Sequence, residues 1–174
     1  MGNQLKSRRP DLPEVELDRP VLNSATLLTR WTKSQILQVY SKYTRHCGNS
    51  RFFLKRGQLN SFLMNTPGSS LELLIIELFL RDGRINILEL LAGLITYSSL
   101  NWTTKVKLAV YVFDFDGNKI ISKDEMVIMM HCFIKSIACM TGADFIQVRE
   151  VEEIADEMFH IIDKDPDGKL TPDE

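Results

Sequence analysis

The spacing of apolar residues in the second half of the chain predicts three helices. The helix that ends before residue 114 has apolar positions at i, i+3, i+4 and i+7, namely Val106, Ala109, Val110 and Phe113. Thr103 or Thr104 can cap its start. The helix before residue 163 repeats this one-faced pattern with Val151, Ile154, Ala155, Met158 and Ile162. The stretch 125–140 between them is apolar on more than one face, which is more than a single packing interface needs.

The segment FDFDGNKIISKDE at 113–125 is rich in oxygen-bearing side chains. Counted from Asp114, a twelve-residue loop has its positions 1, 3, 5, 7, 9 and 12 at Asp114, Asp116, Asn118, Ile120, Ser122 and Glu125. An EF-hand calcium loop uses these positions, with a backbone carbonyl at 7, often a water at 9 and a bidentate Glu at 12. Ile121 falls at position 8, where we expect an apolar residue to join two loops through a short β-bridge.

Position 6 of this loop departs from the EF-hand pattern. The pattern has glycine there because the chain turns sharply, whereas this loop has Lys119, with Gly117 two positions earlier. A residue with a Cβ in a left-handed conformation costs about 1–2 kcal/mol. If the whole cost falls on the bound state, the site binds about tenfold more weakly than one with glycine.

A second segment, DKDPDGKLTPDE at 163–174, matches the pattern at every ligand position. Its ligands are Asp163, Asp165, Asp167, the carbonyl of Lys169, Thr171 and Glu174. Gly168 occupies position 6 and Leu170 position 8. All-oxygen coordination with several carboxylates favours Ca²⁺ over Mg²⁺, and neither loop contains the His or Cys that would favour zinc. The sequence therefore predicts two Ca²⁺ sites.

EF-hands occur in pairs, which predicts two more hands in the first hundred residues. The segment RDGRINILELL at 81–91 keeps Asp82 at position 5, Gly83 at 6, Ile85 at 8 and Glu89 at 12. Its positions 1 to 3 are apolar, so we expect this hand to have lost the ion. The segment KRGQLNSFL at 55–63 is a weaker match, with Gly57 at 6, Leu59 at 8 and Leu63 at 12.

Four stretches together resemble the four-hand calcium sensors: MGNQLK at the start, WTKSQILQVYSKYTRHC at 31–47, DGRINILELLAGLITYSS at 82–99 and the two complete loops. This group includes the neuronal calcium sensors with recoverin and the guanylyl-cyclase activators. It also includes the calcineurin B-like proteins, their homologous proteins and the calcium- and integrin-binding proteins. Two N-terminal hands without an ion favour the calcineurin B-homologous and integrin-binding proteins. The DGRI segment favours the neuronal calcium sensors.

The resemblance implies an all-α EF-hand fold of two paired-hand lobes, with short β-bridges between the loops. We expect a flexible segment at 1–25, an N-terminal lobe with two degenerate hands at 26–100 and a C-terminal lobe with two calcium-binding hands at 101–174. The chain stops at Glu174, so the exit helix that would carry this ligand is missing. We expect a shortened isoform or a fragment, in which the second site binds less tightly than its ligand set predicts.

The start of the chain resembles the acylated N-termini of these families, which implies myristoylation of Gly2. The general pattern has Ser or Thr at position 6, whereas this chain has Lys6. A single acyl chain binds membranes only marginally, so Lys6, Arg8 and Arg9 would supply a second, electrostatic signal. The alternative is an unmodified, charged and proline-rich tail.

Composition narrows the functional classes. The 174 residues, 44% of them hydrophobic, suffice for one domain or for two small lobes that share helices. A net charge of −2 gives no nucleic-acid footprint. No secretory signal precedes the fold and the apolar runs are short, so we expect a cytoplasmic protein with peripheral membrane contact. Cys47, Cys132 and Cys139 are interpreted as reduced, buried thiols.

The three histidines, His46, His131 and His160, are scattered and no nucleophile motif or phosphate loop accompanies them. We therefore expect no catalytic activity.

The leading hypothesis is a calcium sensor that exposes an apolar groove to a target protein helix. Met126, Met129, Met130 and Phe133 are the candidates for that groove, with an ordinary helix core as the alternative. A calcium buffer and a regulatory EF-hand segment of a larger protein are the competing hypotheses.

Overall fold

The computed structural model describes residues 28–47, 52–63 and 78–171. The helices in these ranges are α2 (Lys33–Cys47), α3 (Arg56–Leu63), α5 (Ile87–Tyr97), α6 (Trp102–Phe113), α7 (Lys123–Thr141) and α8 (Val148–Ile162). The strands are β1 (Phe53–Lys55), β2 (Leu80–Arg81), β3 (Arg84–Asn86), β4 (Ile121–Ser122) and β5 (Lys169–Leu170). The strands are short and the helices dominate, which confirms the expected all-α class. Glu174 and the N-terminal residues Gly2, Lys6, Arg8 and Arg9 lie outside the described ranges.

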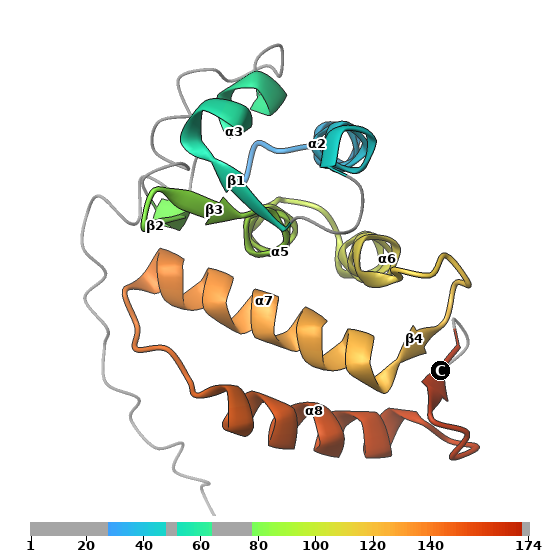
Figure 1. The fold of residues 1–174 in the computed structure, drawn as a ribbon. Coiled ribbons are helices and arrows are strands. Elements are labelled where there is room, and N and C mark those ends of the chain that lie inside the picture. The colour runs from blue at the N-terminus through green and yellow to red at the C-terminus, as the bar shows by residue number, and fades with distance from the viewer. Residues whose placement is uncertain (1–27, 48–51, 64–77, 172–174) are drawn as a thin grey trace, which may run out of the picture.

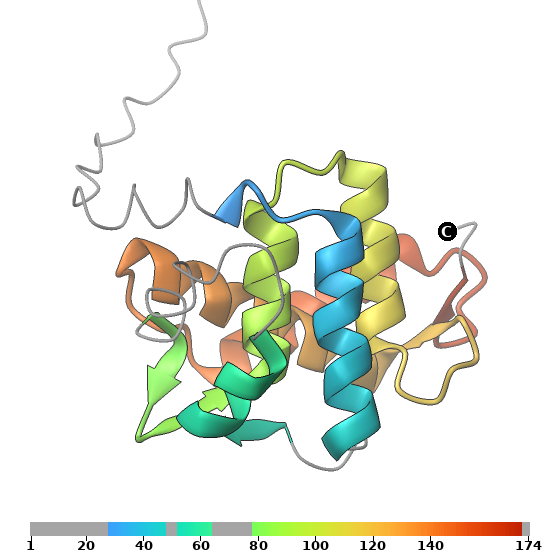
Figure 2. The same ribbon diagram turned by 90° about the horizontal axis from the view of Figure 1, so that it is seen from above.

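The helices stack in layers (Figure 1). Helix α7 lies between α8 on one side and the pair α5 and α6 on the other. Helix α2 packs on the opposite face of α5 and α6, and Figure 2 shows these three helices side by side. None of the described helices is both long and apolar enough to cross a membrane.

Side-chain caps set where the helices begin. Asn101 caps α6 by accepting the Thr104 N–H at 2.9 Å, so the helix begins at Trp102 and the expected cap at Thr103 or Thr104 is wrong by two or three residues. Ser122 and Glu125 form a reciprocal capping box at the start of α7. The left-handed Gly142, with φ of 69°, ends α7.

Two small antiparallel sheets join loops that lie far apart in the sequence. In the first, β4 pairs with β5 and Ile121 lies opposite Leu170, which confirms a β-bridge between the position-8 residues of the two complete loops. In the second, the strand order is β1-β3-β2, and Leu54 lies opposite Ile85.

This second pairing corrects the predicted register of the first hand. Ile85 holds position 8 of its loop, so its partner Leu54, and not Leu59, holds position 8 of the first hand. Position 12 is then Gln58, whose Oε1 accepts the Lys55 N–H at 3.0 Å. Gly57 lies inside α3 and is not the turn glycine that the sequence pattern had suggested.

In the second hand, a tight hairpin takes the place of the first half of an ion loop. Leu80 pairs with Ile85, and Arg81 pairs with Arg84, which leaves a two-residue turn at Asp82 and Gly83. Both turn residues have positive φ, 49° and 73°, as a type I′ turn requires. The apolar positions 1 to 3 of this loop thus belong to the end of a helix and to β2, and they place no oxygen side chain near an ion.

The largest core cluster crosses residue 100. It combines Ile36, Leu54, Ile85 and a run along α5 with Leu108, Val112 and Phe113 of α6 and Cys132 and Met140 of α7. A second, smaller cluster contains Ile121, Met126, Ala155 and Phe159. The two halves of the chain therefore share packing through α6 and α7, and the division into two lobes stays a prediction.

Candidate metal centre

Asp114 organises the first loop from its start, directly after α6. Its Oδ1 accepts the backbone N–H groups of Gly117 at 2.8 Å and Asn118 at 3.1 Å. Its Oδ2 accepts the N–H of Lys119 at 2.9 Å. Three backbone amides directed at one carboxylate wrap the chain around it.

The next two ligand positions hold each other. Asp116 accepts the Asn118 backbone N–H at 3.0 Å and its side-chain amide at 2.7 Å. The Asn118 Oδ1 in turn accepts the Ile120 N–H at 2.7 Å. These local bonds are typical of Asx turns, and they fix the backbone that presents the Ile120 carbonyl at position 7.

Glu125 closes the loop from the first turn of α7. Its carboxylate is buried, with 7% of the residue exposed. Oε1 accepts the Phe115 N–H at 2.8 Å, and Oε2 accepts the N–H and the hydroxyl of Ser122 at 2.9 and 2.8 Å. One side chain thus links the beginning of the loop, its end and helix α7.

Asp114, Asp116 and Glu125 bring carboxylate oxygens to within 4.8 Å of one another. Oxygens on opposite sides of one Ca²⁺ ion lie about 4.6–5.2 Å apart, twice the usual Ca–O distance. Three carboxylates at this spacing repel one another unless a cation offsets their charge. The donor set and its dimensions therefore fit Ca²⁺.

The sharp turn expected at position 6 is present, and Lys119 makes it. Lys119 has φ of 65° and Gly117 has φ of 75°. Gly117 adopts this conformation without strain because glycine has no Cβ. Lys119 carries the cost that glycine would avoid.

The second loop repeats the arrangement. Asp163, Asp165 and Asp167 also bring carboxylate oxygens within 4.8 Å of one another. Asp163 accepts the Gly168 N–H through Oδ2 at 3.0 Å, and Gly168 has φ of 77°. The Asp163 Oδ1 is buried and has no hydrogen-bond partner among the described residues. A buried, unsatisfied carboxylate oxygen is costly, and a bound cation would satisfy it.

In the second hand, an internal cation lies beside the position-12 carboxylate. Glu89 accepts a bond from the Asn86 amide at 3.0 Å and pairs with the Lys135 ammonium at 3.7 Å. Sequence reasoning missed Lys135 because this residue is on α7, 46 positions after Glu89. The α5–α7 packing that brings them together has no local signal in the sequence.

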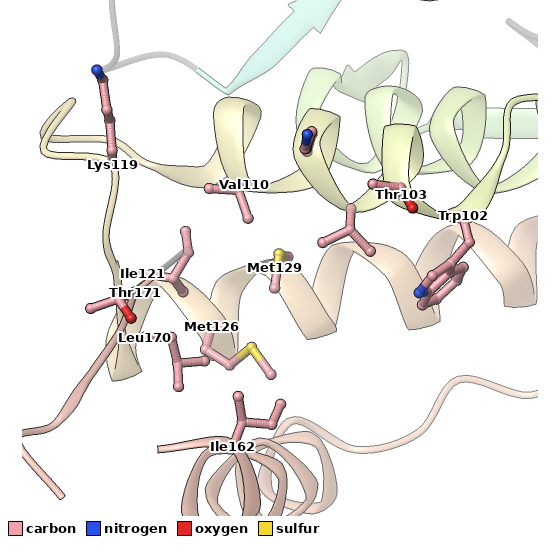
Figure 3. Close-up of a pocket in the computed structure, with 12 residues that line it drawn as sticks. Trp102, Thr103, Val110, Lys119, Ile121, Met126, Met129, Ile162, Leu170 and Thr171 are labelled. Carbon is pink, nitrogen blue, oxygen red and sulfur yellow. The ribbon is translucent and has the colours of Figure 1, made fainter. Parts of the chain in front are cut away.

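An apolar cavity of about 700 Å³ opens beside the two loops. Its apolar lining is Trp102, Val106, Val110, Ile121, Met126, Met129, Ile162 and Leu170. Figure 3 shows Met126, Ile162 and Leu170 gathered at one end and Trp102 at the other. Trp102 is 78% exposed. The walls come from α6, α7, α8 and both bridge strands.

The cavity includes two of the four predicted groove residues. Met126 and Met129 line it, whereas Met130 and Phe133 are not among its lining residues. Met130 packs against the smaller core cluster. Phe133 packs against the main cluster, with its ring 5.9 Å from that of Phe113. The difference arises because α7 contacts α5 on one face and α8 on another.

Burial shifts the pKa values of two polar side chains on α7. Burial raises the pKa of the Cys132 thiol to about 12. Burial, assisted by Lys135, lowers the pKa of His131 from its ordinary value, and the His131 Nε2 has no hydrogen-bond partner among the described residues. A thiol with so high a pKa is a poor nucleophile at neutral pH.

Comparison with known proteins gives two distant relatives, and no protein-family model matches the chain. A calcium and calcium/calmodulin-dependent serine/threonine-protein kinase from Oryza sativa subsp. japonica is 30% identical over 94 residues, which are 54% of this chain and 17% of the kinase. Guanylyl cyclase-activating protein 2 from Lithobates pipiens is 30% identical over 95 residues, 53% of this chain and 48% of that protein. The chain thus spans less than half the length of either relative. These similarities and the two acidic clusters point to an EF-hand calcium-binding family.

Proposed function

We propose that the chain is a calcium-dependent regulatory protein without catalytic activity. It binds Ca²⁺ in the loops 114–125 and 163–174 and engages a target protein helix in the apolar cavity. The observation that carries the proposal is that the loops and the cavity share two residues. Ile121 and Leu170 pair in the β-bridge between the loops and also line the cavity. A change at either loop therefore reaches the cavity wall directly.

At the first site, the ligands would be Asp114, Asp116, Asn118, the Ile120 carbonyl, Ser122 and Glu125. Bound Ca²⁺ supplies the positive charge that offsets the three clustered carboxylates. Glu125 is in the first turn of α7, and the next residue, Met126, lines the cavity. A shift of the Glu125 carboxylate toward the loop centre therefore moves the cavity wall.

The second site is also connected to the cavity, through the end of helix α8. Asp163 is the C-terminal cap of α8, and the preceding residue, Ile162, lines the cavity. The ligands there would be Asp163, Asp165, Asp167, the Lys169 carbonyl, Thr171 and Glu174. The two sites thus act on the cavity through the start of one helix and the end of another.

The test uses Ca²⁺ titration by calorimetry together with stopped-flow fluorescence of an apolar dye. We expect two binding events and a rise in dye fluorescence on mixing with Ca²⁺. Glu125→Gln should remove the first event and reduce the fluorescence change. Asp124→Asn is the matched control, because Asp124 is the adjacent acid but holds no ligand position, and it should leave both signals intact. A chain that binds Ca²⁺ without any change in dye fluorescence would be a calcium buffer.

Two further parts of the proposal concern the surroundings of the chain. Myristoylation of Gly2, with Lys6, Arg8 and Arg9 as the basic signal, would place the protein at a cytoplasmic membrane surface. Intact mass and vesicle flotation of a Gly2→Ala variant test this. The alternative function, a regulatory segment of a larger protein, is favoured by the match to 17% of a longer kinase, and the size of the endogenous protein tests it.

A further inference from the structure

The exposed face of the three-stranded sheet carries a row of three cations. Lys55 on β1 lies directly opposite Arg84 on β3, and Arg84 lies directly opposite Arg81 on β2. Residues opposite each other project from the same face of a sheet. All three are exposed, whereas Leu54, Ile85 and Leu80 of the neighbouring row pack toward the core.

Such a row is unfavourable by itself, because like charges directly opposite one another destabilise a strand pair. Within the described residues, neither Lys55 nor Arg84 forms an ion pair. Arg81 donates to the Leu80 carbonyl at 3.2 Å and to the Cys139 Sγ at 3.4 Å, and neither group carries a full negative charge. Asp82 in the turn and Glu89 in the adjoining hollow are nearby acids. Glu89 pairs with Lys135, so the row keeps an excess of positive charge.

The row borders a hollow with aromatic walls. A cavity of about 390 Å³ is lined by Arg81, Arg84, Lys135, Glu89, Phe53 and Phe145, among others. Residue Phe53 is 60% exposed and Phe145 is 49% exposed, and the Arg81 guanidinium lies 5.8 Å from the centre of the Phe145 ring. The hollow thus places exposed aromatic rings beside the cations, including one ring stacked near the Arg81 guanidinium.

We propose that this basic face binds an acidic segment of the same chain, residues 11–18, DLPEVELD. This segment contains Asp11, Glu14, Glu16 and Asp18 and no basic residue. In an extended conformation Glu14, Glu16 and Asp18 share one side, about 7 Å apart. These three carboxylates equal the cations of the row in number. The long side chains of Lys55, Arg81 and Arg84 can cover the difference between this spacing and the roughly 4.8 Å between neighbouring strands. The proposal does not depend on the calcium sites.

A segment of the same chain is favoured over a separate partner by its proximity. Nine residues lie between Asp18 and Leu28, where the described structure begins, and the ten Cα–Cα steps that join them span up to about 35 Å when extended. Attachment of this kind gives an effective concentration on the order of millimolar. Weak, salt-sensitive charge pairs therefore suffice to occupy the site.

The first test is zero-length cross-linking of the full chain with a carbodiimide, followed by peptide mass spectrometry. We expect amide links from Lys55 to Glu14, Glu16 or Asp18. Lys107, which is also exposed but lies on α6, is the control and should give no such links. The yield should fall at least about fivefold in 1 M NaCl, where the screening length is about 3 Å. Absence of Lys55 links would overturn the proposal. So would links that form only between isotope-labelled and unlabelled chains, which would identify a second copy as the occupant.

The second test uses the sign of a stability change. If the segment is bound, Arg84→Gln removes a bridged charge and lowers the melting temperature. In a background with Glu14→Gln, Glu16→Gln and Asp18→Asn, the same substitution relieves repulsion and should raise the melting temperature or leave it unchanged. Arg149→Gln, on an exposed helix face, is the control and should behave alike in both backgrounds. An equal effect of Arg84→Gln in both backgrounds would refute the proposal.

Discussion

Replacing Lys119 by glycine should tighten Ca²⁺ binding at the first site. Lys119 has φ of 65° at the sharpest point of the loop, and its N–H bond to the Asp114 Oδ2 at 2.9 Å depends on that conformation. A side chain with a Cβ is strained there, and glycine is not. The substitution relieves the strain and leaves every ligand in place.

The expected gain is the difference between two effects. Relief of the left-handed conformation is worth about 1–2 kcal/mol. Glycine's extra freedom in the unbound loop costs about 0.5–1 kcal/mol. The net change of about 0.5–1 kcal/mol corresponds to a two- to fivefold lower Kd at this site. Calorimetric titration with Ca²⁺ measures the change, with Asp163→Asn included in every variant so that the first site is measured alone.

Two variants of the same loop separate the strain from other effects. Lys119→Ala removes the charge but keeps the strain, so its Kd should change less than that of Lys119→Gly. Gly117→Ala adds strain of the same kind at φ of 75°, with no atom close enough to clash, and should raise the Kd by about five- to thirtyfold. If alanine and glycine at position 119 tighten binding equally, charge and not backbone strain limits the affinity, and the reasoning is refuted.

Three further changes test the packing and the unusual groups of the molecule. Gly93→Ala should lower the free energy of unfolding by about 1–3 kcal/mol, because the new Cβ lies 2.6 Å from the Phe79 Cζ. Phe79→Leu should partly restore it, and no loss in a denaturant titration would contradict this packing. The pKa of His131 is lowered in the folded chain, so the unfolded chain takes up the proton first and stability falls as the pH drops below about 6.5. Melting curves of His131→Gln should depend less on pH in that range. The Cys132 thiol, with its pKa raised to about 12, should resist iodoacetamide at pH 8 until urea unfolds the chain, and rapid native alkylation, followed by mass spectrometry, would show that it is accessible.

The complete loops were predictable because their information is local. The ligand positions in 114–125 depend on spacing alone, and the structure brings Asp114, Asp116 and Glu125 together as that spacing requires. The bridge between Ile121 and Leu170 also follows from spacing, since each holds position 8 of its loop. Even the strained turn at Lys119 could be identified from the missing glycine.

The first hand and the cavity were less predictable because they depend on contacts between distant segments. Gly57 suggested a turn, but strand pairing with β3 fixes Leu54 at position 8 and leaves Gly57 in a helix. Once the ion ligands are lost, glycine and acidic residues no longer mark the loop, and only the apolar bridge residue remains. The two faces of α7 also have different surroundings: Met126 lines the cavity, and Phe133 packs against the main core cluster. This difference depends on which helices pack on each face.

The aromatic contacts of Phe115 extend this argument to the relation between the two halves of the chain. Phe115 is position 2 of the first calcium loop, and its N–H is bound by Glu125 at 2.8 Å. Its ring centre lies 6.0 Å from that of Phe52 in the silent first hand and 6.2 Å from that of Phe113 in the core. The backbone of this residue is therefore held by Glu125 while its side chain packs against Phe52 of the N-terminal half. We therefore expect a change in the position of Glu125 to act on α7 through the helix and on the first hand through Phe115. The first hand is thus in contact with the loop that we propose binds Ca²⁺.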